Sequence, residues 1–310
     1  MVPNWDFKVI VINDCSTEGS YEDIPVMFKE FLDVTLLNLP ENHGPGYARQ
    51  VGLDLCATKY VLFLDAGDVI SFASHFILAM KTVEDNPNIA IFSCGRIHYV
   101  DEHEQTYENP NSDVLHGKIY QLAFLRKYHI EFIKEHEYSE DIGFNIMCRF
   151  VCMMLREYFN ENVVLDIDAP VTIELNDNNS VTRKNNGEFY CTSGCGYSAN
   201  AIHAVNNALS NNIPMSIIER EFYTFLVWQY IFFVEPYEKN ICFEQNLKAS
   251  VNLYKYYKQL FPNFNKDLLK EAYRGISLLL KDATGLYFME EVPELSIWDF
   301  INLLEEEIKK

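Results

Sequence analysis

Three short apolar runs in the first part of the chain constrain the fold more than any other feature of the sequence. Lys8–Ile12, Val34–Leu39 and Tyr60–Leu64 predict strands, and each is followed by polar residues. The segments between them, Tyr21–Leu32 and Tyr47–Cys56, have the periodicity of helices. Continuous apolar runs suit strands that helices cover on both faces. The alternation therefore predicts a doubly wound α/β sheet.

The rest of the chain predicts a short mixed region and then a helical one. Strands are expected at Ile89–Ser93 and Val163–Ile167, and a helix at Phe144–Tyr158. Gly, Asn and Ser cluster over Asn176–Gly196, which is typical of a domain boundary. We expect an α/β domain over residues 1–190 and a helical region over residues 191–310. Helices are predicted there at Ala199–Ser210, Ser216–Val234, Phe243–Leu260, Lys266–Lys281 and Trp298–Lys309.

Composition narrows the class of protein. The 310 residues carry a formal net charge of −20, which disfavours general nucleic-acid binding because phosphate backbones are repelled. Met1–Phe7 lacks the basic and apolar pattern of an export signal, and the longest apolar stretch, Phe222–Val234, is too short to span a bilayer. The eight scattered cysteines predict free thiols and a cytoplasmic protein. Cys148 and Cys152 favour helix packing over zinc binding.

The candidate chemistry lies at two strand ends. Asn13-Asp14 follows the first strand, and Asp65-Ala66-Gly67-Asp68 follows the third. Ligands of doubly wound sheets bind beyond the carboxyl ends of the strands. Two aspartates there can hold a divalent cation against a nucleoside diphosphate, and Asp14 could accept hydrogen bonds from a base or ribose. The alternative is that Asp14 and Asp68 only cap the helices that follow.

Several segments in this order resemble the family-two glycosyltransferases of the GT-A fold. They are VIVINDCSTEGS (9–20), NHGPGYARQVGLDLC (42–56), YVLFLDAGDVIS (60–71), HGKIYQLAFLRKYHIEF (116–132), Glu140-Asp141 in SEDIGFN, and PVTIELNDNNSVTR (170–183). The resemblance implies a Rossmann-like mixed sheet flanked by helices. It does not reach the helical C-terminal region.

The resemblance also implies how a nucleotide-sugar donor is bound. Asp14 matches the aspartate that hydrogen-bonds the base. Arg49 and Gly52 match a helix beneath the donor pocket, and His116 begins a loop near the donor. For His116, a structural role is an equal alternative. Asp65 matches the start of the motif that holds the diphosphate and its metal.

For catalysis, the resemblance implies metal-dependent transfer with inversion to a hydroxyl of a glycan or other acceptor. Asp68 is the expected ligand of Mn²⁺ or Mg²⁺, supported by Asp65. Asp141 is the expected catalytic base, and Glu140 is either a reserve base or a partner that orients Asp141. The alternative for Glu140-Asp141 is a solvated helix N-terminus, where acidic residues are favoured.

The chain departs from the family pattern in three places. Asn13 stands where the family usually has Asp, and Gly67 occupies the third position of the usual Asp-x-Asp-Asp motif. The family's usual first strand and helix are also expected to be missing before Lys8. These departures leave open a degenerate binding protein that keeps the fold without transfer. A nucleotidyltransferase is a weaker alternative, because no glycine-rich basic loop lies near the start. The helical region is expected to shape an acceptor site or a homo-oligomer interface.

Overall fold

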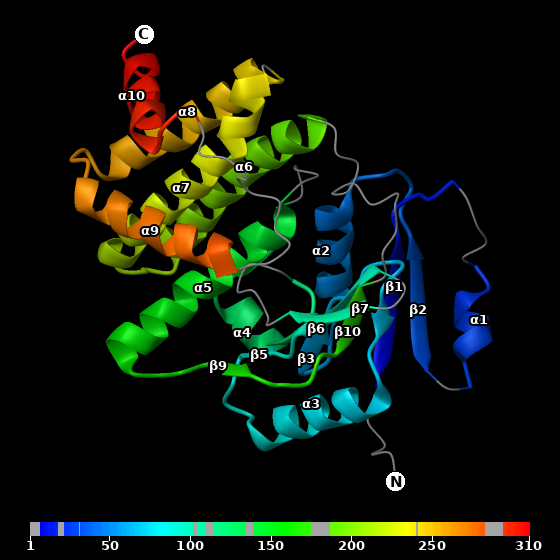
Figure 1. Ribbon diagram of the computed structural model, residues 1–310. Helices are drawn as coiled ribbons and strands as arrows, with labels where there is room; N and C mark the ends of the chain where they lie inside the picture. The colour runs from blue at the N-terminus through cyan, green and yellow to red at the C-terminus, as the bar shows by residue number, and fades with distance from the viewer. Residues whose placement is uncertain are drawn as a thin grey trace. The chain divides into compact units, whose positions relative to one another are not determined.

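The computed structural model describes residues 7–17, 22–30, 32–101, 104–108, 115–133, 139–174, 187–239, 241–282 and 294–310 (Figure 1). The chain forms two compact units, Met1–Asn178 and Asn179–Lys310, and each is described by itself. Residues 187–190, expected at the end of the α/β domain, instead begin the first helix of the second unit.

The first unit opens with a parallel strand pair. β1 (Lys8–Asn13) pairs with β2 (Asp33–Asn38) residue by residue, and α1 (Ile24–Phe28) lies between them in sequence. α1 is shorter than the predicted helix Tyr21–Leu32. The next helix, α2 (Pro45–Leu55), contacts β1, as expected for a β-α-β-α order.

The other described strands of this unit form two mixed sheets. One has the order β3 (Tyr60–Leu62), β8 (Lys118–Gln121), β5 (Ile91–Ser93), β9 (Val164–Asp166). The other has the order β4 (Val69–Ile70), β10 (Thr172–Glu174), β6 (Arg96–Asp101), β7 (Glu104–Glu108). β3 and β5 both pair antiparallel with β8, whereas β5 and β9 are parallel. The predicted mixed α/β fold is therefore confirmed.

Helices and aromatic side chains pack against these strands. Ala79 and Val83 of α3 (Ala73–Asp85) join Phe92 of β5 in a buried core. Short α4 (Leu122–Lys127) follows β8, and the long α5 (Glu140–Phe159) buries most of its first half. Phe63 packs edge-on against Phe132 and Phe144, with ring centroids 5.3 and 5.8 Å away. This contact ties the end of β3 to the start of α5.

The second unit is helical throughout its described residues. Its helices are α6 (Gly187–Ser210), α7 (Met215–Lys239), α8 (Phe243–Leu260), α9 (Lys266–Asp282) and α10 (Ile297–Glu307). These match the five predicted helices, although α6 begins earlier. Phe222, Tyr223 and Tyr257 are fully buried, so aromatic side chains fill the contacts between helices. Within the described residues, no helix combines the length and apolar character that crossing a membrane requires.

Candidate functional site

A tight turn after β3 brings the two predicted metal aspartates together. The backbone N–H of Asp68 donates to the carbonyl of Asp65 at 3.1 Å. Gly67 has a φ of 101°, which other residues rarely adopt and which suits the third position of a type II turn. The departure from the family pattern at Gly67 thus has a structural reason, because an aspartate there would be strained.

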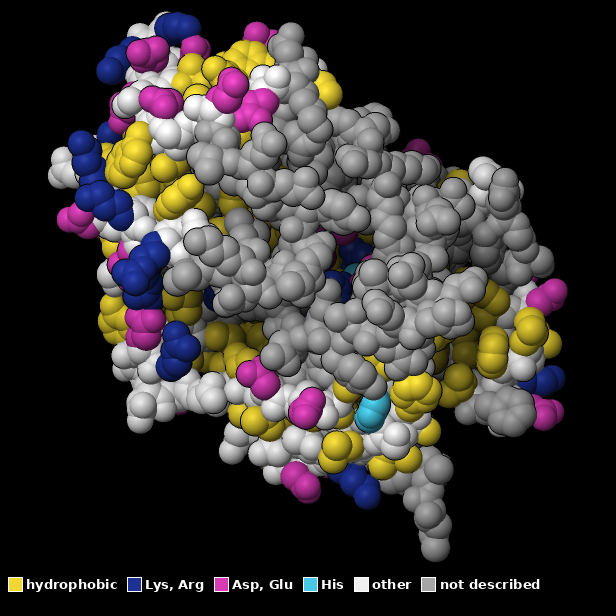
Figure 2. Space-filling view, viewed as in Figure 1, with side chains coloured by type: hydrophobic (Ala, Val, Ile, Leu, Met, Phe, Trp, Pro, Cys, Tyr) yellow, Lys and Arg dark blue, Asp and Glu magenta, His cyan; other side chains and the backbone are white. Residues whose placement is uncertain are grey.

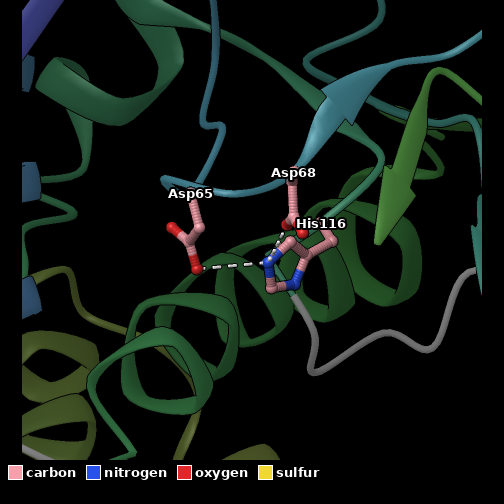
Figure 3. Close-up of side chains that lie close together, drawn as sticks. All are labelled: Asp65, Asp68 and His116. Atoms are coloured by element: carbon pink, nitrogen blue, oxygen red, sulfur yellow. Dashed lines mark hydrogen bonds and ion pairs between the residues drawn. The ribbon is translucent and has the colours of Figure 1, made fainter. Parts of the chain in front are cut away.

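His116 lies beside both aspartates (Figure 3). Its Nε2 is 3.2 Å from Asp65 Oδ2 and 3.3 Å from Asp68 Oδ2. The next residue, Gly117, has a φ of 71°, and a Cβ there would lie 2.2 Å from the carbonyl oxygen of Gly95. Only a glycine lets the backbone pass this closely, and the loop then holds His116 over the turn.

Asp65, Asp68 and His116 could hold a metal ion. One ligand atom from each lies within 4.8 Å of the others, and this is the one such group among the described residues. Carboxylate oxygens suit Mg²⁺ and Mn²⁺, and an imidazole nitrogen is compatible with Mn²⁺. The ligand atoms of these three side chains therefore fit a divalent cation. Cys148 and Cys152 both lie on α5 as free cysteines, the first buried and the second half-buried.

The charges in this cluster depend on one another. Burial lowers the pKa of His116, but its hydrogen bonds to Asp65 and Asp68 outweigh this and raise it to about 9. Burial raises the pKa of Asp65, but the hydrogen bond from His116 and the charge of Arg49 bring it below its ordinary value. A cation binding here would compete with the His116 proton.

Arg49 of α2 connects this turn to the start of α5. Its Nη2 donates to both carboxylate oxygens of Asp65 at 2.8 Å, and its Nη1 donates to Glu140 Oε1. Burial lowers the pKa of Arg49, and the charges of Asp65 and Glu140 raise it above its ordinary value. Arg49 was expected beneath the donor pocket, but its partner Glu140 was not foreseen.

Glu140 and Asp141 form the first turn of α5. Glu140 is buried, so the alternative of a solvated helix N-terminus is wrong for this residue. Burial raises the pKa of Asp141, while the charge of Arg49 opposes the rise. Asn145 donates to the carbonyl of Asp141 at 3.0 Å and accepts from Tyr120 Oη at 2.8 Å. Asn145 therefore links the turn that carries Asp141 to Tyr120 of β8.

Asp14, at the end of β1, holds the loop before α2. Its two carboxylate oxygens accept the backbone N–H groups of His43 at 2.9 Å and Gly44 at 2.7 Å. This differs from the predicted capping alternative, because the helix that follows Asp14 is α1, whose N-cap is Asp23 and which has no side-chain cap. A carboxylate has further lone pairs, so these bonds leave Asp14 able to accept from a ligand as well.

Two supporting residues were not found from the sequence. Gln50, which is buried, accepts the backbone N–H of Phe132 at 2.8 Å and donates to Asp54 at 2.7 Å. Asn145 links Tyr120 to Asp141. Both lie in segments that carry the family resemblance, but each has one partner far away in the sequence, Phe132 for Gln50 and Tyr120 for Asn145, which no local pattern reveals.

The arrangement of strands and helices is that of a GT-A fold. Staphylococcus aureus TarS 1–349 in complex with UDP-GlcNAc shares it with a TM-score of 0.60 and 16% identity, covering 90% of this chain and 84% of that one. The profile of glycosyl transferase family 2 matches residues 3–162. The chain belongs to this family.

Curated relatives agree with this membership over part of their length. The teichoic acid poly(glycerol phosphate) polymerase of Staphylococcus epidermidis is 31% identical over 141 residues, which are 41% of this chain and 20% of that protein. The poly(ribitol-phosphate) beta-N-acetylglucosaminyltransferase TarS of S. aureus is 25% identical over 151 residues, 45% of this chain and 26% of that protein. The matched regions thus span a fifth to a quarter of these relatives.

Proposed function

We propose that this chain transfers a sugar, with inversion, from a nucleoside-diphosphate sugar to an acceptor hydroxyl. The observation that carries the proposal is the gathering of Asp65, Asp68 and His116 at one strand end of a family 2 fold, with Arg49 joining them to the turn that bears Asp141. An acidic pair after a strand is common, but this combination in the family's order is not.

Asp68, Asp65 and His116 would hold the divalent cation, Mn²⁺ or Mg²⁺. Such a cation neutralises the diphosphate and the charge that develops on it as it departs. The first unit is strongly acidic, with 29 acidic and 12 basic residues, so the chain itself offers few charges for this task. This shortage of positive charge supports the proposed cation requirement.

Asp141 would take the proton of the acceptor hydroxyl as that oxygen attacks the sugar. A base works best when its pKa lies near the working pH, and burial moves the pKa of Asp141 in that direction. Glu140 is engaged by Arg49 and is the weaker candidate. One displacement with one base gives inversion at the anomeric carbon.

The comparisons suggest the substrates to try first. The TarS structure holds UDP-GlcNAc, and both curated relatives are named for polymers of a polyol phosphate. We propose a UDP-sugar donor, with Asp14 and its loop next to the base, and an acceptor hydroxyl on a glycan or polyol-phosphate polymer. The helical region 191–310 would contribute to acceptor binding or self-association.

The test is a donor screen with the purified chain. UDP-GlcNAc, UDP-glucose and GDP-mannose are each added with and without Mn²⁺, and release of the nucleoside diphosphate is measured alongside thermal stabilisation. Cation-dependent release that is lost in Asp68→Asn supports the proposal. Cation-dependent binding without release, with a range of acceptors present, would identify a degenerate binding protein. If no donor binds and no nucleoside diphosphate is released, the proposal is rejected.

A further inference from the structure

The guanidinium of Arg49 lies between the carboxylates of Asp65 and Glu140. Its side chain is 14% exposed and that of Glu140 is 8% exposed, so both charges are largely removed from water. Asp65 lies on the other side of the guanidinium, with Nη2 2.8 Å from both oxygens and Nε 3.3 Å from Oδ1. A buried carboxylate without a counter-charge is strongly unfavourable. Glu140 therefore depends on Arg49, whereas Asp65, whose side chain is 39% exposed, is held by Arg49 and by His116 together.

The surrounding backbone fixes Arg49 in place. Gly46, one turn earlier in α2, lies so close to the start of α5 that a Cβ there would be 2.8 Å from the carbonyl of Ile133 and 3.1 Å from Glu140 Cβ. The neighbouring Gln50 accepts the backbone N–H of Phe132 at 2.8 Å. The helix that carries Arg49 is thus held against the segment leading into α5 on both sides of the arginine.

Only an arginine can make this connection. Its planar guanidinium presents N–H groups on different edges, so one edge can hold Asp65 while Nη1 reaches Glu140. A lysine ammonium is a compact charge without a fixed fork. It could neutralise one carboxylate but could not hold two at a set distance.

We propose that Arg49 is a positioning residue that fixes Asp65 of the cation site and the α5 turn bearing Asp141 relative to each other, with Glu140 as its ion-pair partner. This inference rests on the proposed function for the roles of Asp65 and Asp141. It assigns Glu140 to structure and leaves Asp141 as the base. The described side-chain hydrogen bonds of Arg49 all go to the carboxylates of Asp65 and Glu140.

The experiment compares Arg49→Met, Arg49→Lys, Glu140→Met and the double variant Arg49→Met/Glu140→Met. Arg126→Met is the matched control, because Arg126 is exposed and donates only to the carbonyl of Cys56 among its described bonds. UDP-GlcNAc with Mn²⁺ is the probe for kcat and donor KM, and urea unfolding of each variant is measured in parallel.

For Arg49→Met we expect kcat to fall about 100-fold, the effect of misplacing reacting groups by about 1 Å, while donor KM changes less than about threefold. Arg49→Lys should recover part of kcat, and Arg126→Met should match wild type. Each single variant leaves one buried charge unpaired, whereas the double variant removes both charges. The unfolding equilibrium constant of the double variant should therefore change less than the product of the two single effects, by about tenfold or more.

Three results would overturn the inference. A donor KM raised more than about tenfold with kcat unchanged would make Arg49 a donor ligand. Additive effects of Arg49→Met and Glu140→Met on unfolding would show that they do not act as a pair. Equal losses in Arg126→Met would show a general effect of removing an arginine. If wild type turns over none of the donors, the proposed function fails. Urea unfolding of the two single variants and the double variant still decides whether Arg49 and Glu140 act as a pair.

Discussion

The two units of this chain differ in their balance of acidic and basic residues. Met1–Asn178 has 29 acidic and 12 basic residues, whereas Asn179–Lys310 has 16 and 13, so nearly all of the net charge of −20 lies in the first unit. On the second unit, Figure 2 shows basic and acidic side chains interspersed over α9 and α10. An even mixture of signs is typical of a solvated surface. The excess of one sign in the first unit is compatible with the proposed cation-dependent site.

The interiors of the two units differ in the charged side chains that they bury. The first unit buries Lys118 and Glu140 and nearly buries Arg49. Apart from Glu221, the described buried polar residues of the second unit are neutral, such as Gln229, which donates to Ser250 at 3.1 Å. Buried charges are costly unless they are paired, so they are kept where they have a task. The comparison supports the proposal that the chemistry belongs to the first unit.

The largest expected effect tests the chemistry directly. In Asp141→Asn the amide keeps the size of the side chain but cannot take a proton. Turnover should fall by about 10²–10⁴-fold, as for the loss of a general base, while donor affinity stays near wild type. Steady-state turnover and UDP titration measure the two quantities. Equal turnover in Asp141→Asn and wild type would show that another residue is the base.

The next effect tests the cation site. Asp68→Ala should abolish the Mn²⁺-dependent stabilisation of the fold by UDP, because the cation loses a ligand that links it to the protein. At ligand concentrations about 100 times Kd, that stabilisation is about 2.7 kcal/mol in wild type. Differential scanning calorimetry with and without Mn²⁺ measures it. An unchanged shift in Asp68→Ala would remove Asp68 from the ligand set.

A pH series sharpens the electrostatic side of the comparison. Asp65 and Asp68 raise the pKa of His116 to about 9 against the opposing effects of burial and the Arg96 charge. Cation binding must displace the His116 proton, so Mn²⁺ affinity should rise up to about tenfold per pH unit until about pH 9. Calorimetric titrations at several pH values test this. A flat profile in wild type, or the same slope in His116→Gln, would contradict it.

The same shift predicts how the cation-free fold depends on pH. A raised pKa means that the folded state favours protonated His116. Its contribution to stability is therefore complete below the ordinary value of 6.5 and is lost as the pH rises through about 9. Saturating Mn²⁺ should remove this loss.

Local features of this site could be predicted from the sequence, but its connections could not. The apolar runs and the polar residues after them located β1, β2 and β3 and the aspartates at two strand ends, because strand periodicity and turn residues are local signals. The Arg49–Glu140 pair joins residues far apart in the chain, so no local pattern reveals it. The antiparallel pairing of β3 with β8 could not be predicted for the same reason. For this reason the sequence left two roles open for Glu140, that of a reserve base and that of a partner that orients Asp141.

A smaller effect concerns packing in the helical unit. A Cβ on Gly194 of α6 would lie 2.3 Å from Oδ1 of the fully buried Asn246 in α8, so Gly194→Ala should force the helices apart. We expect about 1–3 kcal/mol of destabilisation, typical of overpacking, with Mn²⁺ and UDP affinity unchanged. Gly275→Ala is the control, because a Cβ there meets nothing within 4 Å and alanine favours helix. Equal unfolding midpoints for Gly194→Ala and wild type would rule out this tight contact.

The smallest expected effect is the most direct test of the division between the two units. If the donor site is built entirely from residues of Met1–Asn178, a chain ending at Asn178 that remains folded should bind UDP with Mn²⁺ within about threefold of the full chain. The reason is that this unit contains all five expected donor-site residues and the partners that the structure describes for them: Asp14, Arg49, Asp65, Asp68 and His116. Near-ultraviolet circular dichroism establishes the fold, and Asp68→Ala in the short chain establishes that binding still uses the same site. Loss of UDP binding in a folded short chain would place part of the donor pocket in the helices, and the contrast between a charged, chemical unit and a neutral, supporting one would then be wrong.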